Sequence, residues 1–184
     1  LPSVASICNS RTGGGEQRRV LMFHVILFNP QIPPNTGNII RLCANTGASL
    51  HLIHPIGFQM DEKSCRRAGL DYHALSDVHQ HNALDDCLQA IGNSRMFAIT
   101  KSGSRRYDSA DFAPGDALLF GAETTGLPKS IHNTIDDDRK LALPMTGGNR
   151  SLNLANAVSV VVYEAWRRCD FAGMVTLPAN PDLV

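Results

Sequence analysis

Three loops of this chain combine glycine or proline with polar side chains, and each follows a short apolar segment. They span Asn29–Arg41, Gly121–Pro128 and Pro144–Asn153. If the apolar segments are neighbouring parallel strands, their carboxyl ends meet at one edge of the sheet, which is where ligands bind in open α/β sheets. Each loop taken alone is better explained as a structural turn, but three on one edge favour a shared binding site.

The third loop leads into the longest helical segment of the sequence. A short apolar strand, Leu141–Leu143, is followed by Pro144 and two glycines, and a helix is expected from Leu154 to Trp166. Either Ser151 or Asn153 can cap this helix, since a short side-chain oxygen at that place accepts a hydrogen bond from a backbone amide of the first turn.

That helix is apolar on nearly every side, so we expect it to be buried. Its polar residues are spaced by three, three and four positions and form one stripe, which consists of Asn153, Asn156, Ser159 and Tyr163. A buried polar group needs a partner, because leaving it unpaired costs about 1–3 kcal/mol. The stripe therefore either satisfies the backbone of a neighbouring loop, or borders a ligand site or a subunit interface.

Apolar strands alternate with helices along the chain, which predicts an α/β fold with a mainly parallel sheet flanked by helices. The expected strands are Phe23–Phe28, Leu50–His54, Met96–Thr100, Ala117–Phe120 and Leu141–Leu143. The expected helices are Ile39–Asn45, Lys63–Leu70, Ala83–Ile91 and Leu154–Trp166. Three prolines predict a stiff loop before the first helix, and Gly47 is expected to end that helix.

Composition limits the partners and the compartment. The 184 residues contain 17 Lys plus Arg and 17 Asp plus Glu, so the net charge is zero and any nucleic-acid binding needs a local basic patch. Five cysteines without a CxxC pair indicate neither a zinc site nor a disulfide framework, and they suit a reducing cytoplasm. No run of 18 apolar residues occurs, so no membrane association is expected.

The two ends of the sequence differ in residue composition from the middle. Residues 1–21 are rich in Ser, Gly and Arg, and we interpret them as a flexible extension that comes from a tag or an over-extended gene start. Residues 22–175 form the predicted domain, and residues 176–184 form a tail.

Several familiar catalytic patterns are missing from the sequence. It contains no GxGxxG after a strand, no GxxxxGK[ST] phosphate loop, no GxSxG elbow and no HExxH pair. The histidines are better interpreted as surface or hydrogen-bonded residues than as metal ligands, and we expect no metal.

Four segments together resemble the three ordered motifs of the SpoU-type SPOUT RNA methyltransferases. They are NTGNIIR at Asn35–Arg41, FGAETTGLP at Phe120–Pro128, LPM at Leu143–Met145 and RSLNLANAV at Arg150–Val158. Further runs, at Ile32–Gly47, Ala68–His73 and Val158–Arg167, are most similar to members that methylate the wobble nucleotide of tRNA. The resemblance covers nearly the whole domain.

The resemblance implies a fold and a set of site residues. The fold would be an α/β knot, in which the C-terminal part passes through a loop as a deep trefoil knot. S-adenosylmethionine would lie in the knot against Ile99, Gly121, Leu143 and Ser151. The residues that match the family's catalytic positions are Asn35, Arg41, Glu123, Ser151 and Asn153.

The resemblance also implies a reaction and partners. The enzyme would methylate the ribose 2'-hydroxyl of nucleotide 34, a cytidine or modified uridine, in leucine tRNAs, and would act as a homodimer on the anticodon stem-loop. Alternatives are a related enzyme for another tRNA or rRNA ribose, and a non-catalytic RNA-binding protein. A positive surface could be formed by Lys63, Arg66, Arg67, Lys101, Arg105, Arg106 and Arg150.

Two of the matched residues have roles that their chemistry constrains. A guanidinium stays protonated at any working pH, so Arg41 is expected to clamp a phosphate and orient the hydroxyl rather than act as a base. Glu123 follows a glycine turn and is expected to anchor either Arg41 or a loop amide.

Overall fold

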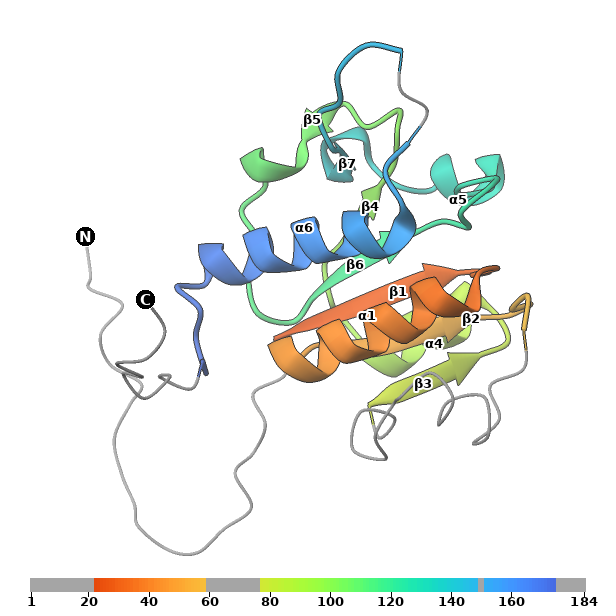
Figure 1. The fold of residues 1–184 in the computed structure, drawn as a ribbon, viewed down its shortest axis with the longest axis horizontal. Helices are drawn as coiled ribbons and strands as arrows, with labels where there is room; N and C mark the ends of the chain where they lie inside the picture. The colour runs from red at the N-terminus through yellow and green to blue at the C-terminus, as the bar shows by residue number, and fades with distance from the viewer. Residues whose placement is uncertain (1–21, 59–76, 149–150, 175–184) are drawn as a thin grey trace, which may run out of the picture.

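The computed structural model describes residues 22–58, 77–148 and 151–174. In these ranges the chain forms one sheet with helices on both faces (Figure 1). The strands are Phe23–Phe28 (β1), Ser49–Ile53 (β2), Val78–His81 (β3), Met96–Ile99 (β4), Arg105–Arg106 (β5), Asp116–Phe120 (β6) and Lys140–Ala142 (β7). The helices are Pro33–Thr46 (α1), Leu84–Ile91 (α4), Lys129–His132 (α5) and Leu154–Arg168 (α6), with 3₁₀ turns at Tyr107–Ser109 (η1) and Asp137–Arg139 (η2).

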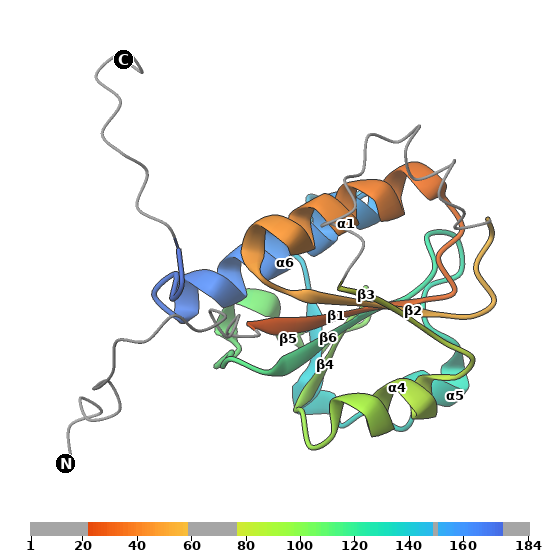
Figure 2. The same ribbon diagram turned by 90° about the horizontal axis from the view of Figure 1, so that it is seen from below.

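The strand order is β3-β2-β1-β6-β4-β7-β5, and the neighbouring strands in it pair in parallel. Helices α1 and α6 cover one face of the sheet, and α4 and α5 lie on the other (Figure 2). Strands β1 and β6 are neighbours, with Leu27 opposite Phe120, so their carboxyl ends lie side by side. This arrangement confirms the predicted parallel sheet with flanking helices.

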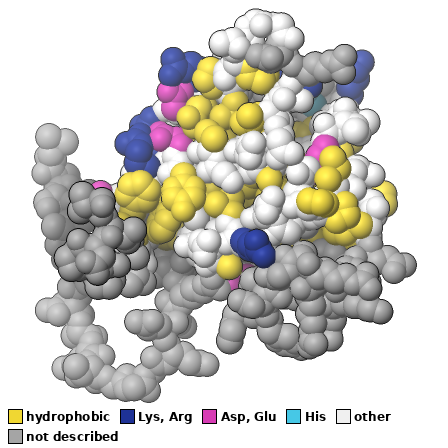
Figure 3. Space-filling model, viewed as in Figure 1, with side chains coloured by type: hydrophobic (Ala, Val, Ile, Leu, Met, Phe, Trp, Pro, Cys, Tyr) yellow, Lys and Arg dark blue, Asp and Glu magenta, His cyan; other side chains and the backbone are white. Residues whose placement is uncertain are grey.

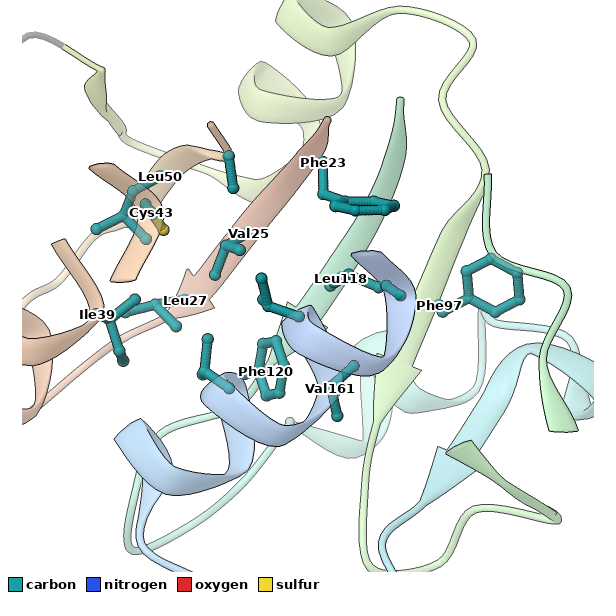
Figure 4. Close-up of a cluster of buried hydrophobic side chains, with 14 of the residues drawn as sticks. Phe23, Val25, Leu27, Ile39, Cys43, Leu50, Phe97, Leu118, Phe120 and Val161 are labelled. Carbon is teal, nitrogen blue, oxygen red and sulfur yellow. The ribbon is translucent and has the colours of Figure 1, made fainter. Parts of the chain in front are cut away.

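Apart from His24, strand β1 is apolar on both sides, because helices cover both faces of the sheet. On the face under α1 and α6, Val25 and Leu27 pack with Ile39 and Val161 (Figure 4). On the opposite face, Ile26 belongs to a second buried cluster with residues of β6 and α4. The alternation of side chains along a strand accounts for this division.

Helix α1 begins earlier than predicted. Its first residue is Pro33, so the predicted start at Ile39 was wrong. Proline lacks an amide hydrogen, but the amides of the first helical turn have no partner within the helix, so Pro33 and Pro34 fit the first two positions. The helix ends as predicted at Gly47, which has a φ of 71°. The earlier start places Asn35 in the first turn of the helix.

Helix α6 begins at Leu154, as predicted, and its cap is Asn153. The expectation that this helix is buried on nearly every side was wrong. Val160 is 39% exposed and Tyr163 is 48% exposed, so one apolar face of the helix is open to solvent in the single chain.

The residues of the polar stripe on α6 do not share one role. Asn153 points toward the loops described below, whereas Ser159 donates a hydrogen bond to the carbonyl of Ala155 within the same helix. Asn156 and Tyr163 are exposed. Only the N-terminal end of the stripe therefore takes part in the candidate site.

Three described elements, β3, β5 and α5, were not predicted. The sequence of β3 is VHQH and that of β5 is Arg-Arg, and neither has the apolar pattern of the predicted strands. Both are edge strands of the sheet, where charged or polar side chains are common. Helix α5 has only four residues, too few for a helical pattern to show.

Some predictions fall on parts of the chain that the structure does not describe. The extension at 1–21, the helix Lys63–Leu70 and the tail at 176–184 lie outside the described residues. Among the helices that are described, α6 is the longest with 15 residues, and none is both long and apolar enough to pass through a lipid bilayer.

Candidate functional site

The three polar loops predicted from the sequence do follow strands of the parallel sheet. The first follows β1 and leads into α1, the second follows β6, and the third connects β7 to α6. Since β1 and β6 are adjacent, the first two loops meet at the carboxyl edge of the sheet. Helices α1 and α6 pack against each other, which brings the start of α6 to the same place (Figure 1).

Glu123, in the second loop, holds the first loop through three hydrogen bonds. Its Oε2 accepts from the backbone amide of Gln31 at 2.9 Å, and its Oε1 accepts from the amide of Ile32 at 3.1 Å. Asn35 Nδ2 donates to Oε1 at 3.0 Å. Of the two anchoring roles considered for Glu123, binding to loop amides is therefore observed. The carboxylate ties the start of α1 to the turn after β6.

Asn153 joins the third loop to the same network. Its Oδ1 accepts from the amides of Ala155 and Asn156, at 2.9 and 3.3 Å, and so caps α6. Its Nδ2 donates to Asn35 Oδ1 at 2.9 Å. The order of donors and acceptors fixes both amide orientations, because the cap requires the oxygen of Asn153 to face the helix. Asn35 must then present its NH₂ group to Glu123.

The network favours the ionised form of Glu123. Burial disfavours the charge, but the hydrogen bonds from Asn35 and from the amides of Gln31 and Ile32 outweigh burial and lower the pKa of the Glu123 carboxyl below its ordinary value. An ionised carboxylate is an acceptor only, which suits a residue that faces three donors. Glu123 is therefore built as a fixed negative anchor rather than as an acid.

Removing this charge should change how stability depends on pH. The lowered pKa means that Glu123 contributes stability that is complete above the ordinary value of 4.5 and is lost as pH falls through the lower pKa of the folded state. Glu123→Gln replaces one acceptor oxygen by a donor, which would face a backbone amide. We expect urea denaturation at a series of pH values to show a steeper loss of unfolding free energy below pH 4.5 in the wild type than in Glu123→Gln.

The matched control for that measurement is Asp170→Asn, which removes an exposed carboxylate from the turn after α6. Asp170 has a φ of 54°, a conformation that asparagine also tolerates, so this variant should keep the acid slope of the wild type. Equal slopes in Glu123→Gln and the wild type would contradict the anchoring role.

The turn that carries Glu123 is closed so tightly that only glycine fits at its start. A Cβ on Gly121 would lie 2.2 Å from the carbonyl carbon of Gly126 and 2.4 Å from the nitrogen of Leu127. The Gly126 amide donates to the carbonyl of Ala122 at 2.8 Å, which closes the turn. The place that a Cβ of Gly121 would take is therefore filled by the backbone of Gly126 and Leu127, which explains why this position needs glycine.

The other proposed cofactor contacts lie beside this turn. Ile99 ends β4, the neighbour of β6, and is half-buried together with Leu143, and both pack against the core. The amide of Thr100 donates to the carbonyl of Leu141 at 2.9 Å, which holds the ends of β4 and β7 together. Ser151 is exposed just before α6. Ile99 is the last residue of its strand, whereas Leu143 and Ser151 belong to the segment between β7 and α6.

Sequence reasoning missed two features of this edge. A loop amide was one of the two expected partners of Glu123, but the sequence did not show that the amides would be those of Gln31 and Ile32. Gly103 packs so closely on β7 that a Cβ there would lie 2.4 Å from the carbonyl carbon of Leu141. The only available signal was a glycine between two serines.

The remaining predicted residues contribute in different ways. Arg41 is exposed on α1, further along the helix than Asn35. In the predicted positive surface, Arg106 forms an ion pair with Asp108, and Arg105 donates to the carbonyls of Ser109 and Asp138. Lys101 is exposed. Lys63, Arg66, Arg67 and Arg150 lie outside the described residues.

The chain matches the sequence profile of a known family, the SpoU rRNA Methylase family, over residues 22–163. A protein of Methylovorus glucosotrophus named tRNA (cytidine(34)-2'-O)-methyltransferase is 50% identical over 154 residues, which cover 84% of this chain and 100% of that protein.

Two solved structures extend the comparison. One, from work on the 2-OH methylation of C/U34 on tRNA, is 41% identical with a TM-score of 0.75, and covers 82% of this chain and 98% of the other. The SpoU methyltransferase AviRb from Streptomyces viridochromogenes, solved with AdoMet, is 25% identical with a TM-score of 0.69, and covers 88% of this chain and 64% of the other.

Proposed function

Because the chain belongs to the SpoU rRNA Methylase family, we propose that it methylates the ribose 2'-hydroxyl of nucleotide 34, a cytidine or modified uridine, in leucine tRNAs, with S-adenosylmethionine as methyl donor. The observation that carries the proposal is the Glu123–Asn35–Asn153 network, which joins the three motif loops at one sheet edge. Relatives at about 50% identity that bear the corresponding name support the choice of substrate.

The residues at this edge fit S-adenosylmethionine. The tight turn from Gly121 to Gly126 would present its backbone groups to the adenosine part, and the half-buried side chains of Ile99 and Leu143 offer apolar surfaces for the adenine. Ser151, which is exposed just before α6, would bind the methionine part. When bound, the sulfonium supplies an already activated methyl group, so methyl transfer needs no metal. The bound cofactor in AviRb supports this assignment.

The protein's main task in this reaction is to align donor and acceptor. Orientation of two reactants can supply about 7–11 kcal/mol of the activation free energy. Asn35, Glu123 and Asn153 hold the three loops in register, and Arg41 binds the phosphate beside nucleotide 34 and orients the 2'-hydroxyl. Since the guanidinium stays protonated, the hydroxyl proton passes to the phosphate or to water.

Replacing Arg41 by lysine tests this role. Arg41→Lys keeps the positive charge but loses the planar fork that binds phosphate through two parallel hydrogen bonds. We expect kcat to fall by about tenfold or more, which corresponds to about 1.4 kcal/mol of transition-state stabilisation. The affinity for S-adenosylmethionine, measured by calorimetry, should stay unchanged. If Arg41→Lys kept the wild-type kcat, two parallel hydrogen bonds to the phosphate would not be needed for the reaction.

We propose a homodimer, with a C-terminal trefoil knot in each chain, as the acting form. Hydrophobic side chains gather along α6 on the face in Figure 3. Val160 and Tyr163 of α6, which are 39% and 48% exposed in the single chain, would be covered by a second copy of the chain. The dimer surface would hold the anticodon stem-loop. The setting proposed is the cytoplasm, without membrane association.

The decisive experiment uses tRNA in which one oxygen is missing. The protein is incubated with labelled S-adenosylmethionine and a leucine tRNA that carries either ribose or 2'-deoxyribose at nucleotide 34. We expect label only in the ribose form. Label that persists in the deoxy form would indicate another tRNA position. Label that appears only when ribosomal RNA is supplied in place of the tRNA would indicate the related enzyme, and tRNA binding without label would indicate a non-catalytic RNA-binding protein.

A further inference from the structure

Histidines gather on the face of the sheet that α4 covers. His24 lies on β1, His51 on β2, and His79 and His81 on β3. Side chains two residues apart point to the same side of a strand, and His24 and His51 alternate with core residues that face α1 and α6. The three strands are neighbours in the sheet, so their imidazoles meet on the face that α4 covers, opposite α1 and α6 (Figure 2).

His51 is at the centre of this group. Its Nε2 lies 3.0 Å from Nδ1 of His24, and its Nδ1 lies 3.0 Å from Nε2 of His81. His51 is only 4% exposed, and burial, with smaller contributions from His24, His79 and His81, lowers its pKa to about 3. The ring is therefore neutral at working pH, with one nitrogen lone pair that can bind a proton donor or a metal.

Helix α4 adds a sulfur to the two imidazoles. Cys87 is fully buried, and its Sγ and the ligand nitrogens of His51 and His81 all lie within 4.8 Å of one another. We propose that His51, His81 and Cys87 bind one divalent metal ion of the zinc type, in a site separate from the methyltransferase site. Two imidazoles and a thiolate are a ligand set that zinc prefers.

The geometry is close to that of a bound ion. Two nitrogens bound to one tetrahedral zinc at about 2.0–2.1 Å are about 3.3 Å apart, and the ring nitrogens of His51 and His81 are 3.0 Å apart. Ligating histidines usually donate their second N–H to another group, and the second nitrogen of His51 already faces His24. A water would complete the site, since His81 is half-buried.

Binding would change the protonation of the site in a defined way. Burial raises the pKa of the Cys87 thiol to about 11, so the metal must displace the thiol proton to form the metal–sulfur bond, and that proton goes to solvent. One of the two facing nitrogens, His51 Nδ1 or His81 Nε2, carries the hydrogen of their mutual hydrogen bond. That hydrogen moves to the other nitrogen of its own ring, and both facing nitrogens then bind the metal. The ion would join β2, the edge strand β3 and α4.

Cobalt(II) provides the direct test because its absorption reports both sulfur ligation and geometry. The full reduced chain is loaded with Co(II) or Zn(II), excess metal is removed, and retained metal is measured by mass spectrometry. We expect one retained metal per chain and a thiolate-to-cobalt charge-transfer band. Cys87→Ser should lose the band, and His81→Gln should retain less metal.

The matched control is Cys43→Ala, which removes a thiol as buried as Cys87 but placed in the core on the opposite face of the sheet. It should keep the charge-transfer band. Circular dichroism of each variant verifies folding, and a zinc-dependent rise in the melting temperature of the wild type gives a second readout. A wild type that retains no metal, or Cys87→Ser that keeps the band, would overturn the proposal.

Discussion

Gly121→Ala is expected to abolish most of the methyltransferase activity while the fold survives. The added Cβ would lie 2.2 Å from the carbonyl carbon of Gly126, and backbone cannot rotate away as a side chain can. The turn after β6 must therefore open, which moves the neighbouring Glu123. Because a misplacement of about 1 Å can cost a hundredfold in rate, we expect kcat to fall by about that factor. Affinity for S-adenosylmethionine, measured by calorimetry, should fall as well.

Gly147→Ala is the control for this substitution. Gly147 lies in the third loop, and a Cβ there would meet nothing within 4 Å. Its melting temperature and activity should remain close to those of the wild type. If Gly121→Ala bound S-adenosylmethionine as tightly as Gly147→Ala does, the tight turn after β6 would have no part in cofactor binding.

Asn35→Asp is expected to give the largest loss of stability among single-atom changes in the site. It would place a second carboxyl group about where Asn35 Nδ2 now lies, 3.0 Å from Glu123 Oε1. Two carboxylates at that distance cannot both stay ionised, so one pKa rises strongly. We expect a loss of about 3 kcal/mol in unfolding free energy at neutral pH, since each unit of pKa shift corresponds to about 1.4 kcal/mol.

The added carboxyl group should change the unfolding free energy with pH in the direction opposite to that of Glu123 in the wild type. A raised folded-state pKa contributes stability that is present below the unfolded-state pKa and is lost as pH rises. In urea denaturation, the unfolding free energy of Asn35→Asp should therefore approach that of the wild type toward pH 4 and should fall further below it as the pH rises. Asn38→Asp adds the same charge at an exposed position of α1 and should change stability by no more than about 0.5 kcal/mol. Equal effects of the two substitutions would contradict the network.

The parts of the fold that followed from the sequence are those with strong apolar patterns. Strand β1 and the start of α6 were predicted correctly because both are buried, and their apolar residues show this burial in the sequence. The start of α1 was missed because prolines were interpreted as a loop, although Pro33 and Pro34 occupy helical positions that need no amide hydrogen. Strand β3 was missed because its histidines carry no strand pattern.

The site was predictable only at the level of motifs. The structure brings Asn35, Glu123 and Asn153 into one hydrogen-bonded chain, but their catalytic roles, and those of Arg41 and Ser151, stay predictions. The proposed metal ligands could not be found from spacing. His51, His81 and Cys87 come from two strands and a helix, and the parallel order of the sheet brings them together.

The position of Asn153 has a consequence for how this enzyme can vary. One small side chain must accept hydrogen bonds from two helix amides and donate another to Asn35. Aspartate can accept but not donate, serine is too short to span both partners, and glutamine places its amide elsewhere. Any replacement of Asn153 would therefore weaken both the cap of α6 and the hydrogen bond to Asn35. Because one side chain serves both, a single assay on variants at this position cannot separate the two effects.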